Sequence, residues 1–423
     1  MIRVVTKALL ALMLFAATAS AERLSLETCL QRAESNNPAL KAAAWDIRIA
    51  EENIRLSQSG YFPRIDAQGG YTAQPRAQAV KISNMTAETQ QPEYATAGVA
   101  AYYTLYDFGR RSARQQQARH AASSTGSMVR AKHKDVALQV IEAYFGILES
   151  ARLLQSAEQE IEQLSRHRKM AQALFEEGST TRNDVLQADV RLAASRQKAV
   201  SIASQRENIW LQLNYLTGTP ESYRAELDAD TAIAVVASGN ENEDSAIGRR
   251  HEIQALREGL KASEAEVNEA GSNYLPELYT RLAMDYVQNS RVREQTIMSA
   301  TVGLKLNIFD GFSTSAIREK AVRNRSRSQD ILRQTEARIR LELATARNDV
   351  NVAKERIKVT ESAVKQSEEN LRINQERYKE RVGTATEVLD AQTLKTQAST
   401  DYYNAVFDYQ VALARLKKAQ GTL

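Results

Sequence analysis

The sequence has 423 residues, with 56 lysines and arginines against 52 acidic residues and a single cysteine. The nearly balanced charge argues against a nucleic-acid partner, and one cysteine excludes an internal disulfide. After the first residues no apolar run approaches the roughly 18 residues that a membrane-spanning helix needs. We therefore expect any part that enters a bilayer to do so as β-strands.

The first 21 residues have the pattern of an export signal. Arg3 and Lys7 accompany an apolar run over 8–17, and Ala19-Ser20-Ala21 forms a small-x-small cleavage site. We expect the signal to be removed so that the mature chain begins at Glu22.

The rest of the chain contains an internal duplication. At an offset of 203 residues the two halves match without gaps, so that Asp107 pairs with Asp310 and Gly218 with Gly421. Upstream the offset is 213, which predicts a longer loop over 74–93 in the first half. We assign a first repeat to 22–220, a linker to 221–245, which is rich in Ala, Asp, Glu and Asn, and a second repeat to 246–423.

Each repeat is expected to contain a helix, two strands, a very long helix, a tight turn and a returning helix. The strands show alternating hydrophobicity, and the long helices have no proline to interrupt them. The first repeat has helices over about 25–60, 112–176 and 184–216 and strands over about 61–74 and 94–108. The second has helices over about 246–273, 315–381 and 386–419 and strands over about 275–288 and 296–310.

The second long helix has the periodicity of a coiled coil. Apolar residues recur every seven positions, at Leu343, Val350, Ile357, Val364 and Leu371. Such a repeat predicts a seam that packs against a neighbouring helix. The first long helix shows a similar but less regular pattern.

The predicted strands have one lipid-compatible face and one polar face, and aromatic residues lie near their ends. This combination is typical of an outer-membrane barrel. Four strands cannot close into a barrel, so other copies of the chain are needed to pair the open edges. Short amphipathic hairpins that cap a soluble coiled coil are an alternative interpretation. The aromatic residues expected at the membrane interface are Tyr61, Phe62, Tyr106, Tyr274 and Phe309.

Several motifs together resemble those of the TolC family of outer-membrane efflux and secretion channels. They are Leu24-Ser25-Leu26-Glu27, Asn36-Asn37-Pro38, Tyr61-Phe62-Pro63, Tyr106-Asp107-Phe108-Gly109, and Phe175-x-x-Gly178 followed by Asp184-Val185-Leu186. The resemblance covers essentially the whole mature chain.

The resemblance implies a mostly α fold with β-strands, in a homotrimer. Its twelve-stranded barrel would lie in outer-membrane lipid and continue as a helical coiled-coil tunnel through the periplasm of a Gram-negative-type bacterium. Such channels have no cofactor and work with a periplasmic adaptor protein and an inner-membrane transporter of the RND or ABC class. They pass drugs, metals or unfolded proteins.

The resemblance also assigns a gate to the turns between the long and returning helices. It implies a polar link between Tyr378 and Asp184, with Glu387 and Asp390 around the aperture. Adaptor contact is implied at the tips, which contain Gly178, Thr181, Gly383 and Thr384. An arginine that usually assists the link is absent, because its matching position is Gly383, and Arg381 stands where the second tip's glycine is expected.

The acidic tip residues also have a purely local interpretation. Thr181-x-x-Asp184 and Thr384-x-x-Glu387 match the capping-box pattern, and acidic groups in a first helical turn interact favourably with the helix dipole. Capping and gating are compatible roles.

No pattern of catalytic or metal-ligating residues appears. The four histidines are scattered, and His167 alone lies near a tip. We therefore predict that the protein is not an enzyme. The resemblance implies a channel subunit for small-molecule efflux. A type I protein secretion duct and a soluble periplasmic coiled-coil scaffold are the two alternatives.

Overall fold

The computed structural model describes residues 23–233 and 243–423, so the expected export signal and part of the expected linker lie outside the described residues. The chain forms two compact units. The helical unit contains the described residues of 1–43, 129–251 and 336–423, and the sheet unit contains 44–128 and 252–335. The long helices α4 (Arg110–Glu176) and α8 (Ser313–Lys379) contribute to both units.

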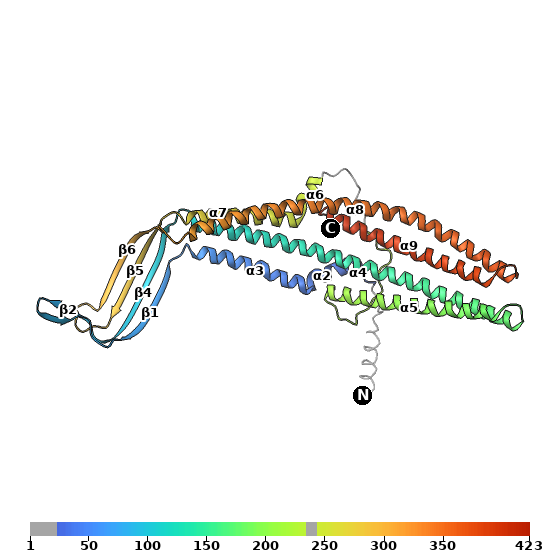
Figure 1. Cartoon of the computed structure of the whole chain (residues 1–423), viewed down its shortest axis with the longest axis horizontal. Coiled ribbons are helices and arrows are strands. Elements are labelled where there is room, and N and C mark those ends of the chain that lie inside the picture. The colour runs from blue at the N-terminus through green and yellow to red at the C-terminus, as the bar shows by residue number, and fades with distance from the viewer. Residues whose placement is uncertain (1–22, 234–242) are drawn as a thin grey trace, which may run out of the picture. The chain divides into compact units, whose positions relative to one another are not determined.

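The sheet unit contains a four-stranded antiparallel sheet in the order β1-β4-β5-β6 (Figure 1). Its strands are β1 (Arg64–Ala73), β4 (Glu93–Tyr106), β5 (Glu277–Val287) and β6 (Thr296–Lys305). The two central strands come from different repeats. Because β1 and β6 each pair on one side only, the sheet has two open edges within the described chain.

The strand register gathers apolar side chains on one face. Val99 lies opposite Met284, which in turn pairs with Met298. Ile65 and Leu282 belong to the same face, as their pairing with Ala101 shows. These side chains are exposed, from 43% for Val99 to 78% for Met298, so the sheet has a wide apolar surface that no described residue covers. Arg64, Asp66, Gln68, Arg281 and Asp285 alternate with them along the strands.

The predicted loop over 74–93 contains a separate two-stranded ribbon. Strand β2 (Ala79–Ile82) pairs antiparallel with β3 (Met85–Glu88). Asn289 fixes this segment from the β5–β6 connection, because its buried side chain donates hydrogen bonds of 2.8 Å to the Thr89 carbonyl and the Gln90 amide oxygen. The longer loop of the first repeat, which accounts for the ten-residue difference, therefore contains an ordered ribbon.

The chain passes from strand to long helix in the same way in both repeats. Asp107 Oδ2 accepts the Arg111 backbone N–H at 2.9 Å, and Asp310 Oδ2 accepts the Thr314 backbone N–H at 2.9 Å. The next two residues, Phe108-Gly109 and Gly311-Phe312, all have positive φ, between 52° and 90°. Equivalent backbone conformations 203 residues apart confirm the duplication.

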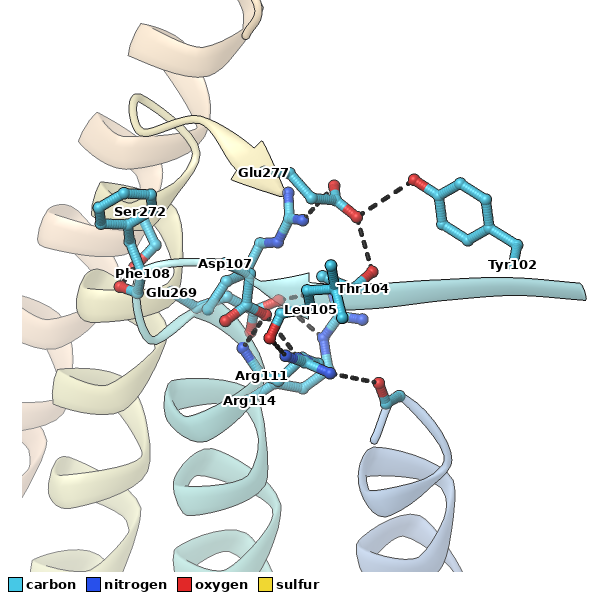
Figure 2. A network of polar contacts seen from close by, with 12 residues as sticks. Tyr102, Thr104, Leu105, Asp107, Phe108, Arg111, Arg114, Glu269, Ser272 and Glu277 are labelled. Carbon is cyan, nitrogen blue, oxygen red and sulfur yellow. Dashed lines mark hydrogen bonds and ion pairs between the residues drawn. The ribbon is translucent and has the colours of Figure 1, made fainter. Parts of the chain in front are cut away.

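A polar network surrounds the first of these junctions (Figure 2). Glu277, at the start of β5, accepts hydrogen bonds from Thr104 Oγ1 at 2.7 Å and from Arg110 Nη2 at 2.6 Å. Arg111 donates to Asp107 at 3.0 Å and to the Gly60 carbonyl at 3.1 Å. Strands of both repeats are thus tied to the start of α4.

In the helical unit the long helices return as hairpins. Helix α5 (Arg182–Thr217) follows α4, and α9 (Ala385–Ala419) follows α8 (Figure 1). The core contains Val140, Tyr144, Phe145 and Leu213. Tyr144 is completely buried, and its hydroxyl lies 3.0 Å from the Leu24 carbonyl and 2.9 Å from the Asp228 carbonyl.

The expected single helix over 25–60 is wrong, because it is two helices, α2 (Leu26–Asn36) and α3 (Pro38–Ser59). Pro38 disfavours helical backbone at the residue before it. The buried Asn37 fills the break, accepting from the backbone N–H groups of Ala39 and Leu40 and donating to the Leu216 carbonyl at 2.9 Å.

The second repeat has the equivalent break. The expected helix over 246–273 is α6 (Glu243–Arg249) and α7 (His251–Ser272), separated at Arg250. The buried Arg250 donates to the Ala419 carbonyl at 3.4 Å, as Asn37 does to Leu216. None of the helices in the described ranges is long and apolar enough to cross a membrane.

Candidate functional site at the helical tips

The two tip turns, over 177–181 and 380–384, have equivalent backbones. Gly178 follows the end of α4 with φ of 72°, and Arg381 follows the end of α8 with φ of 63°. A left-handed residue just after a helix is a common C-terminal cap, usually glycine. Arg381 therefore occupies a glycine position without being glycine.

Only one of the two predicted capping boxes is present. Thr384 Oγ1 accepts the Glu387 backbone N–H at 3.2 Å, and Glu387 Oε2 accepts the Thr384 backbone N–H at 2.9 Å. The capping box predicted at Thr181 is wrong, because its side chain makes no capping hydrogen bond. Asp184 is one methylene shorter than Glu387, and its carboxylate accepts from the Thr180 hydroxyl instead.

Tyr378 is buried among apolar residues of three helices. It is 6% exposed and packs in a cluster with Leu371, Val388 and the partly buried Met170 and Leu174. The Thr180 hydroxyl lies near the Tyr378 side chain. Tyr378 Oη nevertheless makes no hydrogen bond to any described residue. Burial, and then the Asp184 carboxylate, raise the pKa of Tyr378. Tyr378 and Asp184, the expected partners of the polar link, therefore lie near each other within one chain, but no hydrogen bond joins them directly.

His167 contacts Tyr378 from α4. The two ring centroids are 5.3 Å apart with planes inclined by 48°. Burial lowers the pKa of His167, and the Asp184 carboxylate opposes this effect. His167, Asp184 and Tyr378 thus gather at one place from α4, α5 and α8. In the sequence, His167 is distinguished only by its position near a tip.

The two carboxylates expected around an aperture both have a cationic neighbour. Arg377 Nη1 lies 3.8 Å from Glu387 Oε2, and Arg191 Nη2 lies 3.6 Å from Asp390 Oδ1. All four side chains are between 42% and 61% exposed. These are solvent-screened ion pairs, which contribute little to stability but reduce the local negative potential.

Further polar contacts join the two helical hairpins near their tips. Arg381 Nη2 lies 3.7 Å from Glu177 Oε2, which links one turn to the other. The Thr386 hydroxyl donates to Gln187 Oε1 at 3.3 Å. These polar pairs accompany apolar contacts between the hairpins. Met170 and Leu174 of α4 pack against the cluster of Tyr378, and Leu389 of α9 packs with Leu164 and Leu192.

The sequence of this chain matches the model of a protein family. The model of a family described as "Outer membrane efflux protein" matches residues 29–219 and 243–422, which is most of the chain and both repeats. The chain belongs to the outer membrane efflux protein family. It is an outer-membrane transport protein, and the family is not one of enzymes.

Individual relatives of this efflux protein are distant but extend over most of its length. The outer membrane protein TolC of Vibrio cholerae is 23% identical and covers 94% of this chain and 91% of its own. The alkaline protease secretion protein AprF of Pseudomonas aeruginosa is 21% identical over 70% of this chain and 63% of its own. The solved outer-membrane channel OprN has the same fold, with a TM-score of 0.84, 18% identity and coverage of 94% of this chain and 90% of its own.

The expected interface aromatics of the efflux protein all lie in the sheet unit and are exposed. Tyr61 is 38% exposed and Phe309 is 73% exposed, and Phe62, Tyr106 and Tyr274 lie between them. Among the described residues no cluster of histidine, cysteine or acidic side chains could hold a metal ion.

Proposed function

We propose that three copies of this efflux protein form one channel, with the sheets closed into a twelve-stranded barrel in outer-membrane lipid and the helices forming a periplasmic tunnel. The observation that carries the proposal is a sheet with an exposed apolar face and two unpaired edges. In lipid each unpaired backbone group costs several kcal/mol, so the edges of β1 and β6 require partners. Copies of the same chain can supply both.

The assembly can be tested directly on detergent-extracted protein. A closed barrel resists SDS, so an unheated sample should migrate as a trimer and a boiled one as a monomer. In planar bilayers the same material should produce stepwise conductance. A water-soluble monomer without pore-forming activity would instead support the coiled-coil scaffold.

We further propose that the channel exports small molecules together with a periplasmic adaptor and an inner-membrane transporter of the RND or ABC class. Similarity to AprF, a protein named for protease secretion, keeps type I protein export as a second candidate. Affinity capture of the cross-linked trimer distinguishes the two. Recovery of an ABC exporter that carries a peptidase-like domain would contradict small-molecule efflux.

The helical tips are proposed as the gate and as the adaptor contact. Gly178, Thr181, Gly383 and Thr384 lie at the turns, and the position of Tyr378 next to Asp184 supports a closure that joins α8 to α5. Replacing Asp184 with Ala or Tyr378 with Phe should raise single-channel conductance. Unchanged conductance in both variants would remove the two residues from the gate.

The proposed aperture charges have a separate test. Threefold symmetry would place three copies of Glu387 and of Asp390 around a narrow axis and favour cations there. The E387Q/D390N double variant should lower cation selectivity and weaken block by multivalent cations. Selectivity equal to that of the unmodified channel would contradict their position at the aperture.

A further inference from the structure

His167 and Tyr378 form a contact between the two helical hairpins. His167 lies on α4, which returns as α5, and Tyr378 lies on α8, which returns as α9. Their rings pack with centroids 5.3 Å apart. The ion pairs and the hydrogen bond between the hairpins near the tips are exposed. The contact of His167 instead lies at an apolar junction, where Met170 and Leu174 of α4 also pack against the cluster of Tyr378. Farther from the turns, Leu389 of α9 packs with Leu164 and Leu192.

The His167 ring is enclosed in a way that suits only its neutral form. Its Nε2 atom is shielded from solvent and has no hydrogen-bond partner among the described residues. In the imidazolium form both ring nitrogens carry a hydrogen, whichever tautomer is present before protonation. Protonation would therefore create a charged donor at Nε2 without an acceptor, next to the buried ring of Tyr378.

In the described structure the charged groups around this contact make no hydrogen bond to the His167 ring. On α5 the Asp184 carboxylate acts on both rings electrostatically, but it already accepts from the Thr180 hydroxyl. Two further ion pairs lie on the surrounding helices. They are Arg168 of α4 with Asp189 of α5, at 3.0 Å, and Arg377 of α8 with Glu387 of α9, at 3.8 Å.

We propose that His167 is a positioning residue of the gate, whose neutral ring holds Tyr378 and so keeps the two hairpins together, and whose protonation releases them. This inference rests on the channel function proposed above. When His167 becomes charged, its ring must reach solvent or draw Asp184 away from Thr180. Either movement separates α4 from α8 at the tip, so acid opens the closed channel.

Conductance as a function of pH tests the proposal on the full-length trimer. Because histidine normally changes charge near pH 6.5 and burial shifts this lower, open probability should be compared between about pH 7.5 and about pH 5. The unmodified channel should open several-fold more often at the acidic end. H167F keeps an aromatic ring without a titratable group and should stay closed across the whole range.

Two further variants make the result specific. H167Q repeats the loss of titration without an aromatic ring, and it should also show no acid-induced rise. H133Q is the matched control, since His133 lies elsewhere on α4, where its Nδ1 atom is 3.9 Å from Glu34 Oε1. It should respond to acid as the unmodified channel does. Each variant is compared only as an SDS-resistant trimer.

Two results would overturn the proposal. One is an unmodified channel that conducts but does not respond to acid, and the other is an acid response that persists in both His167 variants. Absence of conductance at every pH would have a different meaning, because it would contradict the proposed channel itself.

Discussion

Gly178 and Arg381 occupy equivalent positions in the two repeats and share a left-handed backbone, with φ of 72° and 63°. The cost of this conformation differs between them, because glycine adopts it freely whereas a residue with a Cβ loses about 1–2 kcal/mol. The second tip therefore stores backbone strain that the first tip lacks.

Replacing Arg381 with Gly should stabilise the helical unit by about 1 kcal/mol through relief of this strain. The substitution also removes the exposed ion pair with Glu177, so it is best compared in an E177Q background where the pair is already absent. Thermal unfolding followed by helical circular dichroism measures the effect. As the reciprocal control, G178A should destabilise by a similar amount, because no atom lies within 4 Å of the added Cβ and strain alone acts. Equal melting temperatures for R381G and its parent would refute the conclusion that the backbone at Arg381 is strained.

Replacing Asn37 with Ala should destabilise the protein by about 2–3 kcal/mol. The change leaves the Leu216 carbonyl and two backbone N–H groups of α3 without their partner in a buried place. S25A is the matched control, since Ser25 caps α2 by accepting the Thr28 backbone N–H at 3.2 Å and also bonds the Thr28 hydroxyl at 2.9 Å, both in a partly buried place. Chemical denaturation should show a clearly smaller loss for S25A. A comparable loss for both variants would mean that burial of the Asn37 amide adds nothing.

The two equivalent aspartates at the strand–helix junctions should differ in importance. Asp107 is 6% exposed and accepts from the backbone and the guanidinium of Arg111, whereas Asp310 is exposed. We expect D107A to cost about 2–4 kcal/mol, because a partly buried arginine loses its carboxylate, and D310A to cost about 1 kcal/mol as an ordinary cap. Heat dissociation of the SDS-resistant trimer gives the comparison. If D310A proved the more damaging, the polar network of Figure 2 would not be a stabilising element.

The raised pKa of Glu149 predicts that the stability of the protein depends on pH. Burial, and then the Asp408 carboxylate, raise the pKa of Glu149 from 4.5 to about 7. The folded protein therefore holds a proton that the unfolded chain releases near pH 4.5. The stability that the folded protein gains by holding this proton is fully present below that pH, and it is lost as the pH rises to about 7. E149Q should remove the loss and be about 1–2 kcal/mol more stable than its parent at pH 8, with little difference at pH 4. A constant difference across the pH range would exclude titration of Glu149.

Local sequence signals predicted much of the fold because both copies of a duplicated segment carry the same backbone requirements. The offset of 203 residues pairs Gly218 with Gly421, and both have positive φ, at 66° and 72°. Alternating apolar residues predicted the faces of β4, β5 and β6, and the register places those faces together.

Other features depend on tertiary contacts that a local pattern does not contain. The β2–β3 ribbon follows a stretch without strong alternation and is secured by Asn289, about 200 residues later in the chain. At Thr181 the capping box is replaced by other contacts, because the Asp184 backbone N–H donates to the Thr181 carbonyl and the Asp184 carboxylate accepts from the Thr180 hydroxyl. The packing of His167 against Tyr378 joins helices of different repeats, and the sequence around either residue gives no indication of it.

The ribbon of β2 and β3 also offers a place to mark the protein. Its turn at Ser83 and Asn84 is exposed, occurs in the first repeat alone and lies outside the pairing of the four-stranded sheet. Exposed turn tips tolerate insertion well. A short epitope placed between these two residues should leave assembly intact, and antibody labelling of living cells would then reveal on which side of the envelope the sheet presents this end.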